Sequence, residues 1–217
     1  MLEQLIDIDQ QIIVLINSLH APWADNLMWM VSGKLTWVPL YLLLVALLWW
    51  RLGWKNTLFL LIGFAVAVGC ADYISSGIIK HLVCRPRPTH EPAIMDTLHI
   101  VNGYRGGMYG FVSSHAANTM AVALLFCLIY NNLLVRLRPP KYKTRNALVW
   151  TFLMLWVAAN CYSRMYLGVH YLGDILGGLA VGALSATAVY FACRRLGLLS
   201  PCGCGIGPTG DEPARGE

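Results

Sequence analysis

Three separated segments hold most of the polar residues that could do chemistry in this chain. They are Lys80 to Pro88, Ser113 to His115, and Ser163 to Asp174. In the last segment His170 and Asp174 are four residues apart, so on a helix the carboxylate could accept the proton of one ring nitrogen. The other nitrogen would then be free, and His170 could act as a nucleophile or as a base.

A lysine ends one of the apolar stretches of the chain. Lys80 follows a long apolar run, where a charge is costly and usually marks function. The alternative is that its side chain only extends to the membrane surface. Asp72 and Ser76 precede it at spacing four, which on an α-helix puts the three residues on one face. This polar stripe favours a functional role.

Two arginines could each hold a phosphate through a planar pair of N–H donors. Pro86 and Pro88 disfavour helix at the residues before them, so the apolar helix should end near Cys84. Arg87 should then lie on a stiff, extended segment. Arg164 follows Ser163 directly and stands close in sequence to His170, where it could add a second donor pair.

Two serines and a histidine form the middle segment. Ser113 and Ser114 directly precede a long apolar helix, where serine is a good N-cap and the first backbone N–H groups can bind an anion. Capping alone and phosphate binding explain these serines equally well. His115 would stand at the rim of that anion site, although a lone histidine is more often structural.

The composition indicates a membrane protein. Of the 217 residues, 57% are hydrophobic and 12% are charged, with a mean hydropathy of +0.56, which is too apolar for a soluble domain of this length. The net charge of +5 is modest and gives no sign of nucleic-acid binding. A basic cluster suits a cytoplasmic loop instead. Its members are Arg136, Arg138, Lys141, Lys143 and Arg145.

Five apolar stretches reach or approach the length that spans a bilayer. They cover roughly residues 35–50, 56–83, 116–135, 146–162 and 172–193. Residues 2–19 are too polar to span and place their apolar side chains on one helical face, which predicts an interfacial helix. We therefore expect an all-α fold, a polytopic membrane helix bundle with about five transmembrane helices plus an N-terminal amphipathic interfacial helix.

These stretches divide the chain into three parts. Residues 1–34 form an amphipathic N-terminal segment, residues 35–198 the transmembrane domain, and residues 199–217 a disordered C-terminal tail. Cys202 and Cys204 in the tail could bind metal or become acylated, but an ordinary tail is the simpler interpretation. In the last apolar stretch small residues recur at spacing four, a pattern that allows helices to pack closely. They are Gly178, Gly182 and Ala186.

The distribution of lysine and arginine predicts the topology. Basic residues gather in the first and third connections and after the fifth span, which should therefore be cytoplasmic. They are Arg51 with Lys55, the basic cluster, and Arg194 with Arg195. The connections near residues 84–112 and 163–171 then face outward and bring the three polar segments to one site. Arg85 and Arg105 lie there against the trend, as does Arg87, which hints at another role.

The three segments resemble the signature of the type 2 phosphatidic acid phosphatase superfamily, which reads Lys-x6-Arg-Pro, Pro-Ser-Gly-His and Ser-Arg-x5-His-x3-Asp. The matching residues of the first and third parts are Lys80, Arg87, Pro88, Ser163, Arg164, His170 and Asp174. The middle part departs from the pattern, because Val112 and Ser114 replace the Pro and Gly that flank Ser113. His115 is retained, and the resemblance covers about residues 56–195.

This resemblance implies a helical phosphoric ester hydrolase that works through a phosphohistidine and needs no metal or other cofactor. It makes His170 the nucleophile and Asp174 its orienting partner. His115 becomes the acid that protonates the leaving oxygen and later activates water. The residues that would hold the phosphate are Lys80, Arg87, Ser113, Ser114 and Arg164.

The expected partner is the membrane itself, with a phospholipid, polyprenyl phosphate or lipid A phosphate as substrate. A lipid A phosphate, phosphatidylglycerol phosphate and undecaprenyl diphosphate all fit a site that faces the periplasm from the inner membrane. A non-enzymatic haem protein with two axial histidines is the rival from another class, but it leaves the converging cations unexplained. A zinc site built from His115, His170 and Asp174, and a small-ion transporter, are further alternatives.

Overall fold

The computed structural model describes residues 2–137 and 140–199, and in this part of the chain the regular elements are helices. The helices are α1 (Leu2–Ser18), α2 (Pro22–Ser32), α3 (Val38–Asp72), α4 (Lys80–Val83), α5 (Ser114–Leu137), α6 (Tyr142–Tyr166) and α7 (Leu172–Arg195). A π-helix joins α3 to α4, and four 3-10 turns complete the set. The π-helix covers Tyr73–Ile79. The 3-10 turns cover Leu35–Trp37, Pro88–His90, Met95–Thr97 and Val101–Gly103.

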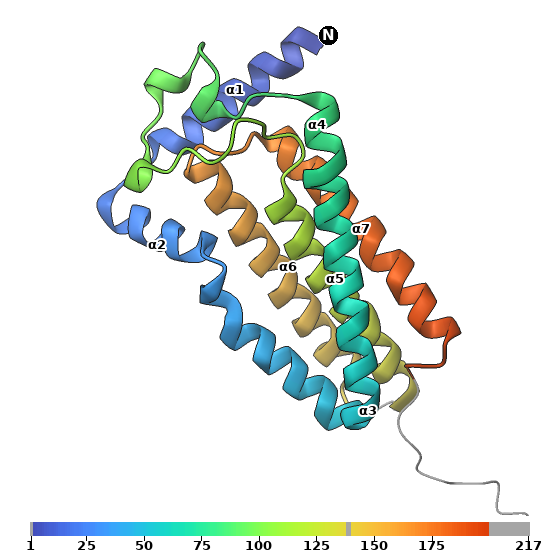
Figure 1. The fold of residues 1–217 in the computed structure, drawn as a ribbon. Helices are drawn as coiled ribbons and strands as arrows, with labels where there is room; N and C mark the ends of the chain where they lie inside the picture. Colours follow the sequence, from blue (N-terminus) through green and yellow to red (C-terminus); the bar gives the residue numbers. More distant parts are fainter. Residues whose placement is uncertain (1, 138–139, 200–217) are drawn as a thin grey trace, which may run out of the picture.

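Helix α3 folds back on itself at Gly53. The glycine has φ 75° and ψ 168°, a backbone conformation that other residues rarely adopt. The two arms, residues 38–52 and 54–72, run in opposite directions, and the second continues through the π-helix into α4 (Figure 1). Gly53 lies between Arg51 and Lys55, so the turn falls in the connection between apolar stretches that was predicted to carry these two basic residues.

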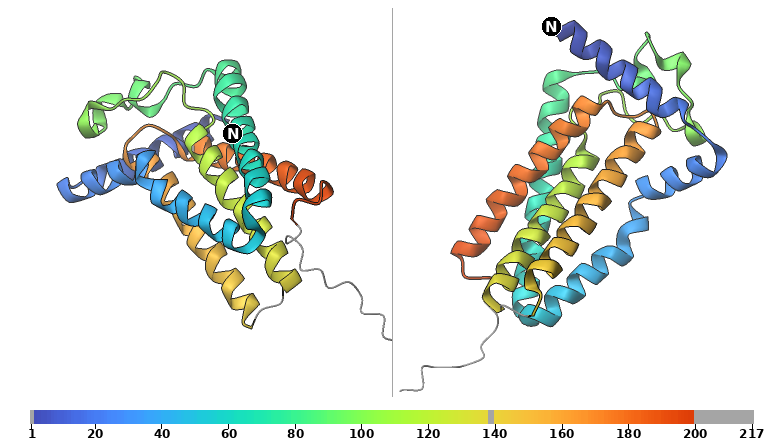
Figure 2. Two further views of the ribbon diagram at one scale, coloured as in Figure 1. Left: turned by 60° about the horizontal axis from the view of Figure 1, so that its bottom comes forward. Right: turned by 180° about the vertical axis from the view of Figure 1, so that it is seen from behind.

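The two arms of α3, with α5, α6 and α7, form a bundle of five helical rods (Figure 2). Three segments among the described residues are long and apolar enough to cross a membrane, and the first contains both arms of α3. They are Leu35–Val83, Ser114–Leu137 and Leu172–Arg195. The remaining rod, α6, is not one of these three segments. It buries polar side chains near its C-terminal end, among them Asn160, Ser163 and Arg164. The predicted all-α membrane bundle is therefore confirmed.

Helices α5 and α7 pack closest in the bundle. A Cβ atom added to Gly178 would clash with the backbone oxygen of Ser113, and one added to Gly182 would clash with that of Ala117. The two backbones therefore touch, which is the use of small residues that the spacing predicted. Helix α5 also contacts α3 and α6, so it lies in the centre of the bundle.

One end of the bundle, which we call the loop end, is covered by α1, α2 and the loop 84–113 (Figures 1 and 2). Helix α1 packs on α6 and α7, and α2 packs on α6. Helix α1 buries Ile13 and Asn17, whose amide nitrogen donates to the carbonyl oxygens of Tyr166 and His99. Several of its apolar side chains stay exposed, as an interfacial helix requires. They are Leu5, Ile6, Ile8 and Leu15.

The predicted N-terminal segment, residues 1–34, folds as two helices, and its proposed boundary falls just before the turn Leu35–Trp37. The proposed disordered tail, residues 199–217, lies outside the described residues apart from Leu199. The same is true of Cys202 and Cys204. The division of the chain at residues 34 and 198 stays a prediction.

The π-helix corrects one detail of the sequence analysis. Asp72, Ser76 and Lys80 were expected on one face because α-helical residues four apart align. The segment Tyr73–Ile79 instead has the wider π-helical turn, which changes the alignment. Asp72 still accepts a hydrogen bond from Asn118 of α5, and Lys80 still reaches α5, but Ser75 rather than Ser76 is fully buried.

Candidate active site

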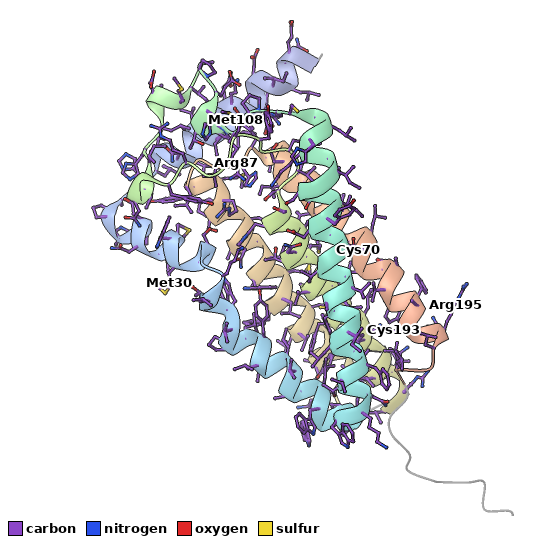
Figure 3. The ribbon with its side chains drawn as sticks, viewed as in Figure 1. Met30, Cys70, Arg87, Met108, Cys193 and Arg195 are labelled. Atoms are coloured by element: carbon purple, nitrogen blue, oxygen red, sulfur yellow. The ribbon has the colours of Figure 1, made fainter. Side chains whose placement is uncertain are left out.

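The predicted site residues come together at the loop end, around a cavity of about 360 Å³. Five of the eight line it directly, and they come from two helices and two loops: Arg87, Ser114, His115, Arg164 and His170. Figure 3 shows Arg87 in the loop at this end and Arg195 at the far end of α7. Arg87 and His170, which are 83 positions apart, therefore share one polar cavity.

The histidine and the aspartate of the third segment are in contact. His170 Nδ1 lies 3.3 Å from Asp174 Oδ2, and the two side chains are 2% and 0% exposed. His170 was expected on a helix, but it lies two residues before α7 begins, and the prediction was wrong on this point. Asp174 stands in the first turn of α7, and the same Oδ2 accepts the backbone N–H of Tyr171. With Nδ1 bound to the carboxylate, Nε2 of His170 is the free nitrogen.

The surroundings of His170 keep its imidazole neutral. Burial, followed by the positive charges of Arg87, Arg164 and Lys80, lowers the pKa of His170 well below its usual range. At neutral pH the ring therefore carries a lone pair on one nitrogen. A neutral imidazole beside several cations can attack an electrophile that brings negative charge with it.

Arg87 is held by the loop backbone. Its φ of −70° and ψ of 158° are extended, as the flanking prolines predicted, and α4 ends at Val83 just before the left-handed Cys84. Its backbone N–H donates to Met108 O and its Nε donates to Tyr109 O. Burial is the main cause that lowers the pKa of Arg87, but the guanidinium remains a cation because its ordinary pKa is so high.

Arg164 is held by two residues that the sequence analysis did not name. Its Nη1 donates to Ser32 Oγ, and its Nη2 donates to Tyr104 Oη over 3.3 Å. Arg164 and Arg87 are only 7% and 8% exposed. Within the described residues, Arg164 Nε, Arg87 Nη1 and His115 Nε2 are buried without a hydrogen-bond partner in the chain. Buried donors of this kind fit a bound anion such as phosphate.

The serines and Lys80 have different positions at the site. Ser113 is fully buried and accepts the N–H of Ala116 over 3.4 Å, so it caps α5. Its side chain is not among those that line the cavity, whereas Ser114 does line it. Lys80 Nζ donates to Ser114 Oγ over 3.2 Å and therefore lies one layer behind the cavity wall. Phosphate contacts from Ser113 and Lys80 stay predictions.

Comparison with known proteins identifies the family. The model of the PAP2 superfamily matches residues 56–196. A lipid A 4'-phosphatase of Bacteroides thetaiotaomicron is 35% identical over 90% of this chain and 81% of its own length, and that of Porphyromonas gingivalis is 32% identical over 87% and 74%. The crystal structure of a PAP2-type phosphatidylglycerolphosphate phosphatase from Bacillus subtilis aligns with a TM-score of 0.64 at 21% identity, covering 89% of this chain and 88% of that one.

The chain belongs to the PAP2 superfamily. The predicted family is thereby confirmed, and so is the predicted class of enzyme, a membrane-integral phosphatase of lipid phosphates. The solved structure supports the fold of this PAP2 protein. The roles of individual site residues are not tested by these likenesses.

Several residues that line the polar cavity of this PAP2 protein lie outside the three predicted segments. They are Trp29, Ser32, Gly33, Lys34, Asp72, Tyr104 and Asn118. One signal could have found Lys34, because it begins an apolar stretch much as Lys80 ends one. Ser32 and Tyr104 carry no such signal, since their role depends on contacts with Arg164, which is 60 or more residues away in sequence.

The sequence analysis also considered a zinc site. Within residues 2–137 and 140–199, no group of three or more His, Cys, Asp and Glu side chains is arranged to hold a metal ion. His115 and His170 both line the polar cavity, but Asp174 lies behind His170, where it binds the ring and the backbone of Tyr171. This arrangement orients a histidine and leaves the carboxylate unavailable as a third ligand.

Proposed function

We propose that this PAP2 protein removes a phosphate from a lipid of the bacterial envelope, through a phosphohistidine on His170. The proposal rests on the arrangement of two adjoining cavities. Beside the polar cavity lies an apolar one of about 420 Å³, and Lys34, His115 and Asn118 line both. A lipid phosphate needs this combination, because its head group is charged and its tail is apolar.

The apolar cavity runs along the membrane-spanning part of the bundle. Residues of both arms of α3 and of α5 line it, including Tyr41, Leu48, Phe64 and Val122. A substrate tail in this cavity would leave the lipid phase without entering water, so its transfer would carry no hydrophobic penalty. The phosphate would then lie in the polar cavity between Arg87, Arg164 and His170.

The proposed reaction has two steps. His170 Nε2 attacks phosphorus in line, the new P–N bond forms as the ester P–O bond breaks, and His115 gives a proton to the leaving lipid oxygen. His115 then takes a proton from a water molecule, which attacks the phosphohistidine and releases inorganic phosphate and free His170. The two arginines neutralise the equatorial oxygens during both steps. Asp174 supports the positive charge that develops on the imidazole of His170.

Among the candidate lipids we rank a lipid A phosphate first. Two relatives that match most of this chain are named lipid A 4'-phosphatases, and both exceed 30% identity. Phosphatidylglycerol phosphate and undecaprenyl diphosphate come next, because they present the same combination of phosphate and long tail. The polar cavity is lined by Trp29 and Lys34 in addition to the arginines, which leaves room beside the phosphate for a polar head group.

A panel of lipids tests this proposal. Purified protein in detergent should release phosphate from a lipid A phosphate faster than from phosphatidylglycerol phosphate or undecaprenyl diphosphate. His170→Ala, purified in parallel, gives the background. Failure of the active preparation to exceed that background with all three lipids would contradict the function. A faster reaction with one of the other two lipids would overturn the ranking alone.

We also propose that the site faces the periplasm from the inner membrane. The loop end holds the site, and the opposite end carries the basic residues of the turn at Gly53, of the α5–α6 connection and of the α7 terminus. Lys and Arg favour the cytoplasmic side of a membrane. In a variant with Cys84 as its single cysteine, an impermeant thiol reagent should label spheroplasts. An Arg194→Cys variant without other cysteines should be labelled only after lysis, and the reverse pattern would contradict this orientation.

A further inference from the structure

Arg85 is one of the outward-facing cations that the proposed reaction does not use. Its Nη1 lies 3.4 Å from Asp174 Oδ1, the carboxylate oxygen that does not contact His170. Its guanidinium stacks on the ring of Tyr171, with 3.9 Å between the guanidinium carbon and the ring centroid. Arg85 is therefore the cation that compensates the buried charge of Asp174, since a carboxylate that is 0% exposed needs such a partner.

An aspartate of the N-terminal helix holds this arginine. Asp9 Oδ2 lies 2.9 Å from Arg85 Nη2, and its other oxygen accepts the backbone N–H of Gly173 over 3.1 Å. The side chain of Asp9 is only 12% exposed, so solvent screens this pair weakly. Asp9 therefore fixes two neighbours of Asp174, the arginine on one oxygen and the residue that precedes it in α7.

Gly173 allows this close approach. A Cβ atom added there would lie 2.9 Å from Asp9 Oδ2 and 3.5 Å from Arg85 Nη1. The first distance is shorter than any normal contact, so a side chain at this position would displace the carboxylate. The glycine, the aspartate and the arginine thus form one unit behind Asp174.

We propose that Asp9 is a positioning residue for phosphoryl transfer, acting through Arg85 to hold Asp174 against His170. This inference rests on the proposed function of His170 and Asp174. Asp9 lies on α1, outside residues 56–196 that match the family model. The N-terminal helix therefore takes part in the reaction besides lying at the membrane surface.

The test compares two isosteric substitutions on one helix. Asp9→Asn keeps an acceptor for the N–H of Gly173 but removes the charge that holds Arg85. It should lower kcat roughly tenfold, the loss expected for one charge-assisted hydrogen bond, and leave KM nearly unchanged. Asp7→Asn, on the same helix but exposed, is the control and should match the unaltered protein. Thermal unfolding of both variants should coincide.

A double-mutant cycle separates positioning from simple tethering of α1. Because Asp9 acts through Arg85, Asp9→Asn should cost nothing further in an Arg85→Ala background. Gly173→Ala, which displaces the Asp9 carboxylate, should reproduce the loss in kcat, whereas Gly69→Ala, with no atom within 4 Å of the added Cβ, should not.

Two results would overturn the inference: a kcat of Asp9→Asn equal to that of Asp7→Asn, or a full additional loss in the Arg85→Ala background. Both require an unaltered protein that releases phosphate. An unaltered protein that releases none from any lipid would instead remove the proposed function, and this inference with it.

Discussion

The two sides of the central helix α5 are packed differently. On one side α7 touches α5 backbone to backbone at Gly178 and Gly182. On the other side the first arm of α3 faces α5 across the apolar cavity. The close contact carries the groups of the proposed reaction, because Asp174 lies in the first turn of α7 and its carbonyl oxygen accepts the backbone N–H of Ser113, just before α5. Chemistry needs fixed distances, whereas a lipid tail needs space, and the bundle separates the two.

The largest effect should come from the pair on the closely packed side. His170→Ala should abolish turnover and any phosphoenzyme, because among the described residues His170 is the nucleophile that Asp174 orients. Asp174→Asn should lower kcat by about 10⁴-fold, since the imidazole loses the partner that fixes its tautomer. Single turnovers with labelled substrate, quenched in alkali and followed by peptide mapping, would detect an acid-labile adduct on the His170 peptide.

The outcome that contradicts covalent catalysis is specific. If fully active protein formed no adduct and phosphorus inverted its configuration during hydrolysis, His170 would be a base that activates water. His115→Ala is the informative companion, because it removes the leaving-group acid. With a substrate whose leaving group needs no proton, the phosphoenzyme should then accumulate.

The next effect concerns the two arginines that line the polar cavity, Arg87 and Arg164. Arg87→Ala and Arg164→Ala should each lower kcat/KM by about 10²-fold or more, because each removes a preorganised donor pair from the transition state. Arg105→Ala is the control, since Arg105 lies in the same loop but donates to Thr89 O. Steady-state kinetics on the three variants would decide the matter. Equal, small losses of kcat/KM at all three positions would mean that Arg87 and Arg164 only form a solvated basic surface.

A smaller effect should follow from loosening the closely packed side. Gly182→Ala places a methyl group against the carbonyl of Ala117, so it should destabilise the protein by about 1–3 kcal/mol. Gly69→Ala, on the second arm of α3 with open space around the added atom, should be neutral or slightly stabilising. Thermal unfolding in detergent measures both. Equal midpoints would mean that the α5–α7 contact is softer than its geometry implies.

The smallest effect should come from filling the loosely packed side. Val45→Trp would fill part of the apolar cavity and crowd a bound tail, and an overpacking cost of about 1–3 kcal/mol should raise KM for a long-chain lipid roughly tenfold. A short-chain, water-soluble phosphate ester should be hydrolysed as before. Leu43→Trp is the matched control, because Leu43 is exposed on the same arm. A loss with both substrates would show that Val45 supports the site itself and not the tail.

Much of the fold could be predicted because its signals are local. The apolar stretches and the basic residues between them gave the spans, and the spacing from His170 to Asp174 gave the contact between them. The spacing did not say that His170 would precede the helix, since a loop residue can reach the same carboxylate as a helical one. Membrane spans and contacts between residues close in sequence can therefore be predicted from the local sequence.

The remaining parts of the site depend on contacts that are distant in sequence. Tyr104 and Ser32 hold Arg164 from a loop and from α2, and Asp9 reaches Gly173 across 164 positions. None of these residues has an unusual type or spacing. The π-helix was also hidden, because hydrophobic periodicity does not distinguish one widened turn from an α-helix.

The number of residues in that widened turn determines the direction in which the Lys80 side chain points. Each residue of an α-helix advances the side-chain direction by about 100°. A π-helical turn holds one residue more than an α-helical turn, so the segment Tyr73–Ile79 behaves as a one-residue insertion that the helix absorbs without a break. Deleting one residue there would restore an ordinary helix and leave Lys80 facing Ser114, whereas α-helical turns through the undeleted segment would rotate Lys80 by about 100°, away from Ser114.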